Sequence, residues 1–297
     1  MSTQANLPVM QSVKQAFQWG GYVIAGHPVF FIALVLVSFA VQLSYWWMGG
    51  KPDVLLALLV ILLYVANGLG LLALVLVTHN EVLRGQSDFG AATLGRGGGR
   101  IFTYLLDLLA VSVLVALSVA ASMLLVVPVG MGLHATMLPE GALVVFFALF
   151  YVAMFGVYVG VTARLMLRLP SRAIGQPLRW GRVWALGRNN TLRLIGANAL
   201  VFLIFLVPVL VILLGAGALV GGDIGRIQSF LGQFAAEHFR PNGTIFHGPP
   251  SLALALMAGL NALLTPIELV VFAAFYSIAY ARLIGNLQAE PQGFVSA

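Results

Sequence analysis

The sequence contains no cysteine and very few charged residues. The 297-residue chain therefore has no disulfide, no thiolate metal site and no cysteine nucleophile. Charged residues make up 8% of it and hydrophobic residues 61%, whereas soluble domains have roughly 25% and 45–50%. Because a water-soluble fold of this length could not bury so much apolar surface, we expect the lipid bilayer to be the solvent for most of the chain.

Acidic residues are also scarce. The chain has 9 Asp and Glu against 15 Lys and Arg, a formal net charge of +6. In so apolar a chain, this excess favours attraction to an anionic membrane leaflet over binding of nucleic acid. The partners we expect are therefore membrane lipids, and we expect no nucleic acid.

Long apolar runs predict six transmembrane helices. A helix needs roughly 20 apolar residues to cross the hydrocarbon core, whereas the strands of a barrel are half as long and alternate in polarity. The fold class expected is all-α, a polytopic membrane helical bundle that forms one domain over residues 1–297, with residues 222–250 as an extracytoplasmic loop. The expected spans are residues 29–48, 54–78, 101–128, 141–163, 194–220 and 252–281.

Basic residues are concentrated in the loops on one side of these spans. Seven arginines and no acid lie between Arg164 and Arg193. Short loops rich in Lys and Arg stay in the cytoplasm, so both termini are expected to be cytoplasmic. Only Lys51, Arg226 and Arg240 fall on the other side. The twelve residues on the cytoplasmic side are Lys14, Arg84, Arg96, Arg100, Arg164, Arg168, Arg172, Arg179, Arg182, Arg188, Arg193 and Arg282.

Three segments have the spacing of amphipathic helices that lie in the headgroup plane. One interpretation is that all three are linkers that lie along the membrane surface. The other is that the third segment, on the outer side, forms a lid or a surface on which a partner docks. Their apolar stripes are Val9, Val13, Phe17, Gly20 and Ile24; Trp180, Val183, Trp184 and Gly187; and Ile224, Ile227, Phe230, Leu231 and Phe234.

Two acids fall inside the expected spans, where a charge is costly and often functional. Asp107 follows Arg100 by roughly 10 Å of helix, which places it within reach of that arginine or of headgroup water. Glu268 precedes Arg282 by roughly 21 Å, deep in the bilayer, where we expect it to be protonated or held by polar neighbours such as Asn67. It is either a proton-coupled transport group or one buried hydrogen bond of the bundle.

No catalytic, cofactor or metal site is predicted. The five histidines lack the paired spacing of metal ligands, and no Ser/His/Asp arrangement stands out.

Pro208 and Pro266 fall near mid-span and leave the carbonyls of Ile204 and Ala262 without helical donors. Such breaks build binding sites in transporters, but they are also ordinary kinks.

One stretch carries a family resemblance. The string Val183-Trp-Ala-Leu-Gly-Arg-Asn-Asn-Thr-Leu-Arg-Leu-Ile195 resembles a six-span family of bacterial inner-membrane proteins, although Arg188-Asn189-Asn190 departs from the Gly-Asn of that family. Further similar segments are Leu83–Gln86, Val126–Pro128, Arg164–Pro170 and Tyr280–Leu283. A related membrane domain is fused to glycerophosphodiester phosphodiesterases, whose catalytic barrel and acidic metal ligands are absent here. The resemblance implies the six-span topology, a bacterial inner membrane and a module that works beside a partner.

These observations predict a non-enzymatic inner-membrane protein. It would act as a scaffold or accessory subunit that binds lipids or other membrane-protein subunits through a basic cytoplasmic face. The alternative is a transporter of a small solute or lipid with a midplane site in the last helix hairpin. The residues expected to bind lipid or a partner are Arg164, Arg168, Arg172, Arg179, Trp180, Arg182, Trp184, Arg188 and Arg193, and those of a possible intramembrane polar site are Asn67, Asp107 and Glu268.

Overall fold

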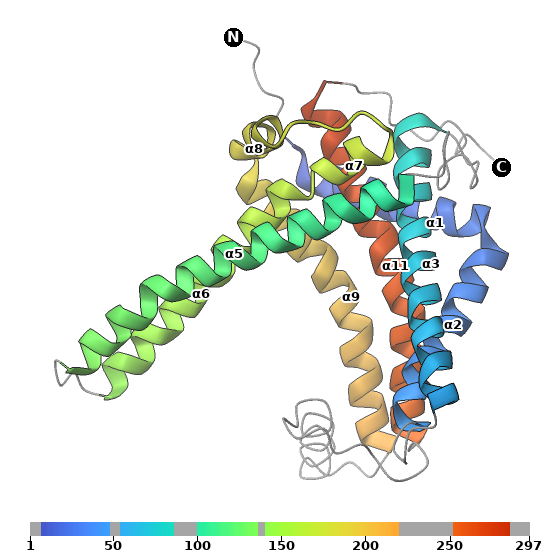
Figure 1. Cartoon of the computed structure of the whole chain (residues 1–297), viewed down its shortest axis with the longest axis horizontal. Helices are drawn as coiled ribbons and strands as arrows, with labels where there is room; N and C mark the ends of the chain where they lie inside the picture. The colour runs from blue at the N-terminus through green and yellow to red at the C-terminus, as the bar shows by residue number, and fades with distance from the viewer. Residues whose placement is uncertain (1–6, 48–53, 86–99, 136–139, 220–251, 286–297) are drawn as a thin grey trace. The chain divides into compact units, whose positions relative to one another are not determined.

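The computed structural model describes residues 7–47, 54–85, 100–135, 140–219 and 252–285, and the regular secondary structure in these ranges is helical throughout (Figure 1). This confirms the expected all-α fold for that part of the chain. The helices are α1 (Val9–Gly26), α2 (Pro28–Trp47), α3 (Val54–Arg84), α5 (Arg100–Ala135), α6 (Glu140–Leu165), α7 (Arg168–Ala173), α8 (Trp180–Arg188), α9 (Thr191–Leu219) and α11 (Leu252–Leu283).

Five segments of the described chain are long and apolar enough to cross a membrane, and a bent helix pair brings the number to six if it is counted as one span. Large apolar side chains, such as Leu55, Leu58 and Leu62 on α3, remain exposed along these segments. Soluble proteins rarely expose such continuous apolar surface, so the chain has the helices of an integral membrane protein. The five segments are Val54–Arg84, Arg100–Ser118, Val152–Ala173, Thr191–Val211 and Ala258–Leu283.

The bent pair consists of α1 and α2, which meet at 95°. Pro28 begins α2, and a proline disfavours helical geometry in the residue before it, here His27. Proline is well tolerated at the first position of a helix, so α2 restarts there in a new direction. The backbone N–H of Phe31 donates to the carbonyl of His27 at 3.0 Å, which closes the first turn.

The described chain divides into two compact units, and the boundaries fall inside helices. Unit 1 contains Met1–Trp19, Leu76–Ala199 and Phe272–Ala297, and unit 2 contains Gly20–Val75 and Leu200–Val271. Unit 1 therefore includes α5, α6, α7 and α8 together with one end each of α1, α3, α9 and α11. Unit 2 includes α2 and the remaining parts of those four helices.

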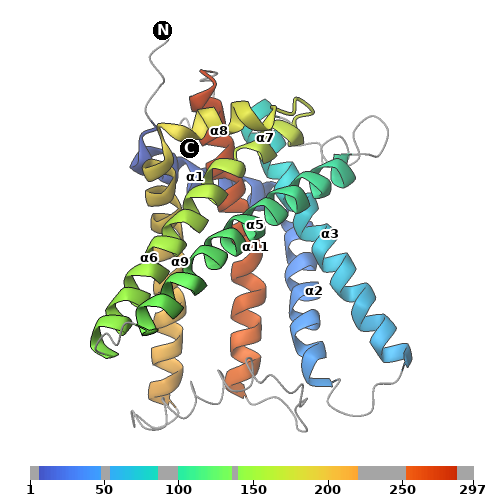
Figure 2. The ribbon, with the colours of Figure 1, turned by 60° about the vertical axis from the view of Figure 1, so that its left-hand side comes forward.

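In unit 1, α5 and α6 run side by side as a helical hairpin (Figures 1 and 2). One face of α5 is buried at helical spacing, through Tyr104, Asp107, Val111 and Val115. Val111 and Val115 pack with Leu165 at the end of α6 in one apolar cluster. The same buried face therefore carries an acid between apolar residues.

Two glycines lie just after helices of unit 1 and end them. Gly85 after α3 and Gly175 after α7 have φ angles of +63° and +75°, a backbone conformation that glycine adopts at little cost. The N–H of Gly175 donates to the carbonyl of Arg172 at 2.9 Å, which supplies a partner for one of the last carbonyls of α7. The chain can therefore turn directly from α7 towards α8.

Candidate functional site

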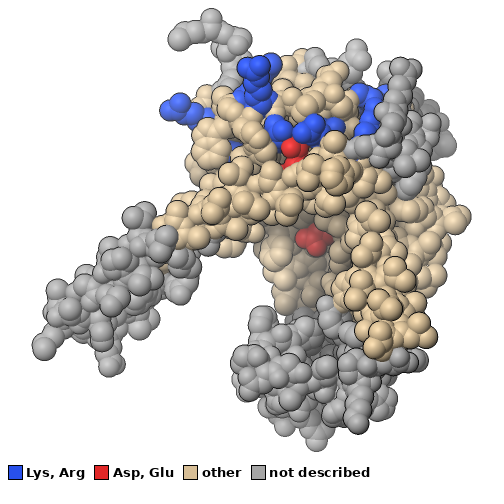
Figure 3. Space-filling view, in the orientation of Figure 1, with Lys and Arg blue, Asp and Glu red and all other residues tan. Residues whose placement is uncertain are grey.

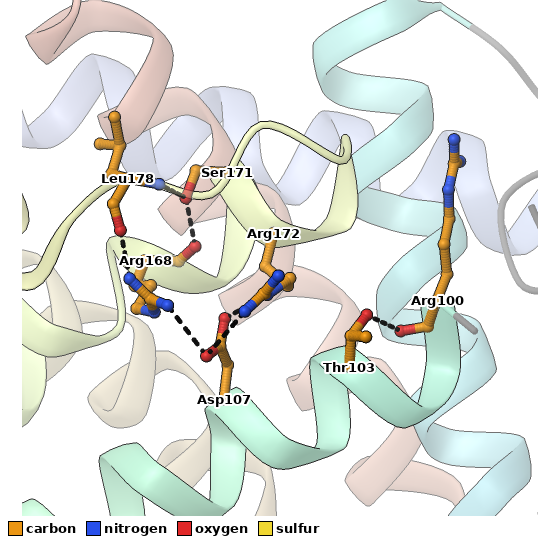
Figure 4. A network of polar contacts seen from close by, with 7 residues as sticks. All are labelled: Arg100, Thr103, Asp107, Arg168, Ser171, Arg172 and Leu178. Atoms are coloured by element: carbon orange, nitrogen blue, oxygen red, sulfur yellow. Dashed lines mark hydrogen bonds and ion pairs between the residues drawn. The ribbon is translucent and has the colours of Figure 1, made fainter.

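Asp107 on α5 binds two arginines of α7 (Figure 4). Arg168 donates from Nη2 to Oδ1 at 3.1 Å. Arg172 donates from Nε to Oδ2 at 2.5 Å and from Nη2 to Oδ1 at 3.3 Å. One carboxylate therefore faces two guanidinium groups, so the cluster has a formal charge of +1 and its acid is fully engaged.

Arg168 is the more deeply buried of the two arginines, with its side chain 10% exposed. Its Nη1 donates to the carbonyl of Leu178, and its guanidinium lies 4.1 Å from the centroid of the Trp180 ring. Hydrogen bonds to an anion and contact with an aromatic face both stabilise a cation that has lost water. Arg168 thus holds the segment after α7 against α5.

The end of α3 holds α7 from another direction. Nδ2 of Asn80 donates to the carbonyl of Ala173 at 3.4 Å, and Arg84 donates to the carbonyl of Ile174. These carbonyls belong to the last turn of α7, where a helix has no internal donors left. The short helix is therefore fixed by side chains from both α3 and α5.

The next helix, α8, packs closely against α6 through Val183 and Gly187, which are both buried. A Cβ atom at Gly187 would lie 2.7 Å from Cγ and 3.3 Å from Cα of Arg164. Nε of Arg164 donates to Oγ1 of Thr191 at 2.7 Å, and its guanidinium lies 4.5 Å from the centroid of the Trp184 ring. Arg164 therefore connects α6, α8 and the start of α9.

Replacing Gly187 with alanine is expected to destabilise the fold by about 1–3 kcal/mol, the usual range for overpacking. The new methyl group would meet the Arg164 backbone as well as its side chain, so α8 would have to move away from α6. Gly181→Ala on the same helix is the matched control, because nothing lies within 4 Å of its Cβ position. It should be neutral or stabilising by up to about 1 kcal/mol. Titration of the purified protein with sodium dodecyl sulfate measures both, and equal midpoints for the two variants would contradict the close packing.

The nine residues expected to form a basic docking face divide into two groups. Arg164, Arg168 and Arg172 make contacts inside the chain, and Trp180 is partly buried beneath Arg168. Arg179, Arg182 and Arg188 are exposed, Trp184 is 41% exposed and Arg193 is partly buried. Figure 3 shows Lys and Arg side chains gathered at one end of the described surface. Three of the seven arginines between Arg164 and Arg193 are therefore exposed: Arg179, which immediately precedes α8, and Arg182 and Arg188 on α8.

Two expectations about this region differ from the structure. Asp107 was expected to reach Arg100 or headgroup water, but its observed partners are Arg168 and Arg172, which lie 61 and 65 residues further along the chain. The stripe containing Val183 and Gly187 was expected to enter the headgroups. Both residues are instead buried inside unit 1. Because Gly187 has no side chain, its backbone can pack directly against Arg164 at the end of α6.

A second polar cluster, around His79 of α3, was not anticipated from the sequence. Nδ1 of His79 lies 2.6 Å from Oγ of Ser277 on α11, and Nε2 lies 3.0 Å from the hydroxyl of Tyr104 on α5. A hydroxyl beside an imidazole is the arrangement of a nucleophile and its base. All three residues, however, are at most 2% exposed, so the pair is closed to solvent. The cluster joins three helices through a buried polar network.

The intramembrane residues Asn67 and Glu268 both lie in unit 2, and the contact between them that was one of the two expectations for Glu268 is not formed. Oδ1 of Asn67 accepts a hydrogen bond from Oγ of Ser38 at 2.6 Å. Glu268 is partly buried and has neither a hydrogen bond nor an ion pair with another described residue. The polar neighbour expected for Glu268 is therefore bound to α2 instead.

The end of α11 is tied to α1. Arg282 donates to Oε1 of Gln15 at 2.7 Å and to Oε1 of Gln11 at 3.3 Å. Near the start of α1, the backbone N–H of Leu7 donates to Oδ1 of the buried Asn190 at 3.1 Å. Part of the polar side of α1 is therefore used to bind the chain itself.

In the part of the chain that the structure describes, no three His, Cys, Asp or Glu residues form a group that could hold a metal ion. The expected outer helix at 224–234 and the loop at 222–250 lie outside the described residues. Comparison with protein-family models, curated proteins and solved structures gave no match.

Proposed function

We propose that this chain is a non-enzymatic, six-span protein of a bacterial inner membrane that binds anionic lipid or a partner subunit through α8. The observation that carries this proposal is the exposure of Arg179, which immediately precedes α8, and of Arg182 and Arg188 on α8, a short helix packed against α6. Arg164, Arg168 and Arg172 are engaged in contacts within the chain, whereas these three arginines are exposed to an external anion. The half-exposed Trp184 ring lies on the same helix and suits a headgroup interface.

The strength of such binding follows from the charge. Each Lys or Arg near an anionic leaflet contributes about 1 kcal/mol, so three arginines contribute about 3 kcal/mol, or roughly a hundredfold in affinity. The interaction weakens as salt rises, because exposed charges are screened within about 10 Å at 0.1 M ionic strength. Attraction to a leaflet is therefore strong only where several charges act together.

Replacing Arg179, Arg182 and Arg188 together with glutamine is expected to weaken binding of an anionic phospholipid by roughly a hundredfold. Binding is measured on the full chain in neutral detergent, from the rise in melting temperature on adding phosphatidylglycerol, with phosphatidylcholine as the lipid control. The triple Arg→Lys variant keeps the charge and should bind within a few-fold of the parent. An unchanged response of the glutamine variant to phosphatidylglycerol would remove the proposal.

The proposed orientation places both termini and α7–α8 in the cytoplasm, supported by the excess of basic residues among the loops on that side. The absence of cysteine allows a direct test with single introduced thiols. An impermeant reagent applied from outside should label cysteines at positions 51, 134 and 243, but not at 86 or 176. Gln176 is chosen over its neighbour Gly175, whose φ of +75° would strain any other residue. Labelling at position 176 in sealed cells would contradict the proposed orientation and indicate the opposite one.

The proposed topology counts α2 as a full span and α1 as a helix in the headgroup plane. The 95° bend supports this arrangement, because a helix perpendicular to a span lies along the membrane. Val13 and Gly20 of the stripe expected to enter the headgroups are instead buried in the chain, whereas Met10 and Tyr22 are exposed. The sequence resembles a six-span inner-membrane family and lacks the catalytic barrel of the enzymes to which a related domain is fused. Both points agree with this topology and with an accessory role.

The second candidate function is transport of a small solute or lipid along the last helix hairpin. The observation that favours it is Glu268, which lies within the candidate span Ala258–Leu283 without a hydrogen bond or ion pair in the described chain. Ionisable groups inside membranes commonly mark ion or substrate paths. Pro266, inside α11 and two residues before Glu268, leaves the carbonyl of Ala262 without its helical donor.

A further inference from the structure

Polar side chains follow one face of α11 within its apolar span. Asn261, Thr265 and Glu268 are spaced by four and three residues, so they lie on one side of the helix. The surrounding segment, Ala258–Leu283, is long and apolar enough to cross a membrane. We call these three residues the α11 stripe.

Within the α11 stripe, Glu268 lies far from both ends of the span. Glu268 follows Ala258 by ten residues and precedes Arg282 by fourteen, which correspond to roughly 15 and 21 Å of helix. Even the longest side chains cannot bridge such distances. The charge of Glu268 is therefore not balanced by Arg282 at the end of its own helix.

The oxygens of the α11 stripe are partly organised already. Oγ1 of Thr265 donates its hydrogen to Oδ1 of Asn261 at 3.3 Å, which leaves the hydroxyl oxygen as an acceptor. Asn261 is exposed, and Thr265 and Glu268 are partly buried. Glu268 makes no hydrogen bond or ion pair within the described chain. The stripe thus offers a carboxylate, a hydroxyl oxygen and an amide oxygen to a ligand from outside the chain.

The described residues of unit 2 supply no lysine or arginine to this acid. Residues 20–47, 54–75, 200–219 and 252–271 contain His27 as their single basic side chain, and His27 lies at the junction of α1 and α2. An isolated carboxylate in a medium of low polarity is strongly disfavoured. A positive charge from outside the described unit would remove that penalty.

From this arrangement we infer that the α11 stripe binds one small monovalent cation, with Glu268 as the charged ligand and Thr265 and Asn261 as neutral ligands. Oxygen ligands select hard cations. A single carboxylate neutralises one positive charge, whereas a divalent ion would keep a net charge in the membrane and demands six or more oxygens. Sodium and ammonium share this chemistry. Binding here is the step that the second candidate function requires, and it can be tested without measuring transport.

The test uses the full chain purified in neutral detergent at pH 8. Choline chloride is replaced at constant ionic strength by sodium, potassium or ammonium chloride, and the melting temperature is followed by tryptophan fluorescence. A ligand that binds only the folded state raises the melting temperature and saturates with concentration. We expect a saturable rise of several degrees with at least one of these ions, and the ion that acts at the lowest concentration identifies the natural class. Glu268→Gln should abolish the rise, and Thr265→Val should weaken binding by about tenfold.

The matched control is Ser112→Ala on α5. Ser112 is also an exposed polar residue in a candidate span, but its hydroxyl donates to Leu108 of its own helix at 3.0 Å. This variant should keep the full response, and so should the Arg179/Arg182/Arg188→Gln variant, which separates this site from lipid docking. The inference is overturned if no cation gives a saturable rise, or if Glu268→Gln responds like the parent. Should Glu268→Gln fail to fold, an unchanged cation affinity in Thr265→Val would overturn it equally.

Discussion

Asp107→Asn is expected to lower the free energy of unfolding by about 3–5 kcal/mol, the range observed when one partner of a buried ion pair is removed. Asparagine keeps the shape of the side chain but removes the negative charge that Arg168 and Arg172 both bind. Two guanidinium groups would then face each other, and Arg168, with its side chain 10% exposed, could not be rehydrated. Titration with sodium dodecyl sulfate, followed by circular dichroism, measures the loss.

Two comparisons distinguish this effect from a general disturbance of α5. Ser112→Ala changes an exposed residue of the same helix and should stay within about 0.5 kcal/mol of the parent. Adding Arg168→Met to Asp107→Asn removes the unpaired buried charge, so the double variant should regain part of the lost stability. If Asp107→Asn alone were as stable as the parent, the ion cluster could not be what holds α7 on α5.

His79→Ala is expected to cost about 3–5 kcal/mol. The substitution removes a buried ring between three helices and leaves the hydroxyls of Ser277 and Tyr104 without the imidazole as partner. Both hydroxyls belong to residues that are at most 2% exposed, so water cannot readily replace the lost bonds. The same detergent titration measures the change, and the unfolding transition should move to a lower detergent fraction.

A combined variant separates the hydrogen bonds from the packing. In a Ser277→Ala, Tyr104→Phe background, His79→Ala leaves no hydroxyl unsatisfied, so it should cost less than it does in the parent chain. The difference between the two costs gives the coupling energy of the network, which for contacting residues usually lies between about 0.5 and 3 kcal/mol. Equal costs in the two backgrounds would show that His79 acts by volume alone.

Hydropathy located the long helices, and α3 and α5 both continue past the ends of the expected spans. The expected span 54–78 corresponds to α3, which continues to Arg84. The residues after the predicted end, from His79 to Glu81, are polar, and a hydropathy criterion treats them as the start of a loop. In the structure they are at most 2% exposed, because other helices, not lipid, surround this part of α3. Polarity along one segment does not reveal partners contributed by distant helices.

The density of arginines identified the basic end of the chain but not the contacts within it. The pairing of Asp107 with Arg168 and Arg172 joins positions more than sixty residues apart, so no local spacing could indicate it. Gly187 belonged to a predicted apolar stripe on sequence grounds. Its actual importance is the absence of a side chain where α8 meets Arg164, a property that appears only once α6 and α8 are placed together.

In the proposed orientation, with α7 in the cytoplasm, the burial of Arg168 beside Asp107 would give the same arginine two consecutive roles during biogenesis. While the nascent polypeptide leaves the translocon, α7 has not yet docked, and each arginine of this loop repels the loop from the translocated side. Once the helices assemble, Arg168 is withdrawn from water and becomes an internal counterion. A neutral substitution at this position would therefore affect both the direction of insertion and the durability of the finished fold.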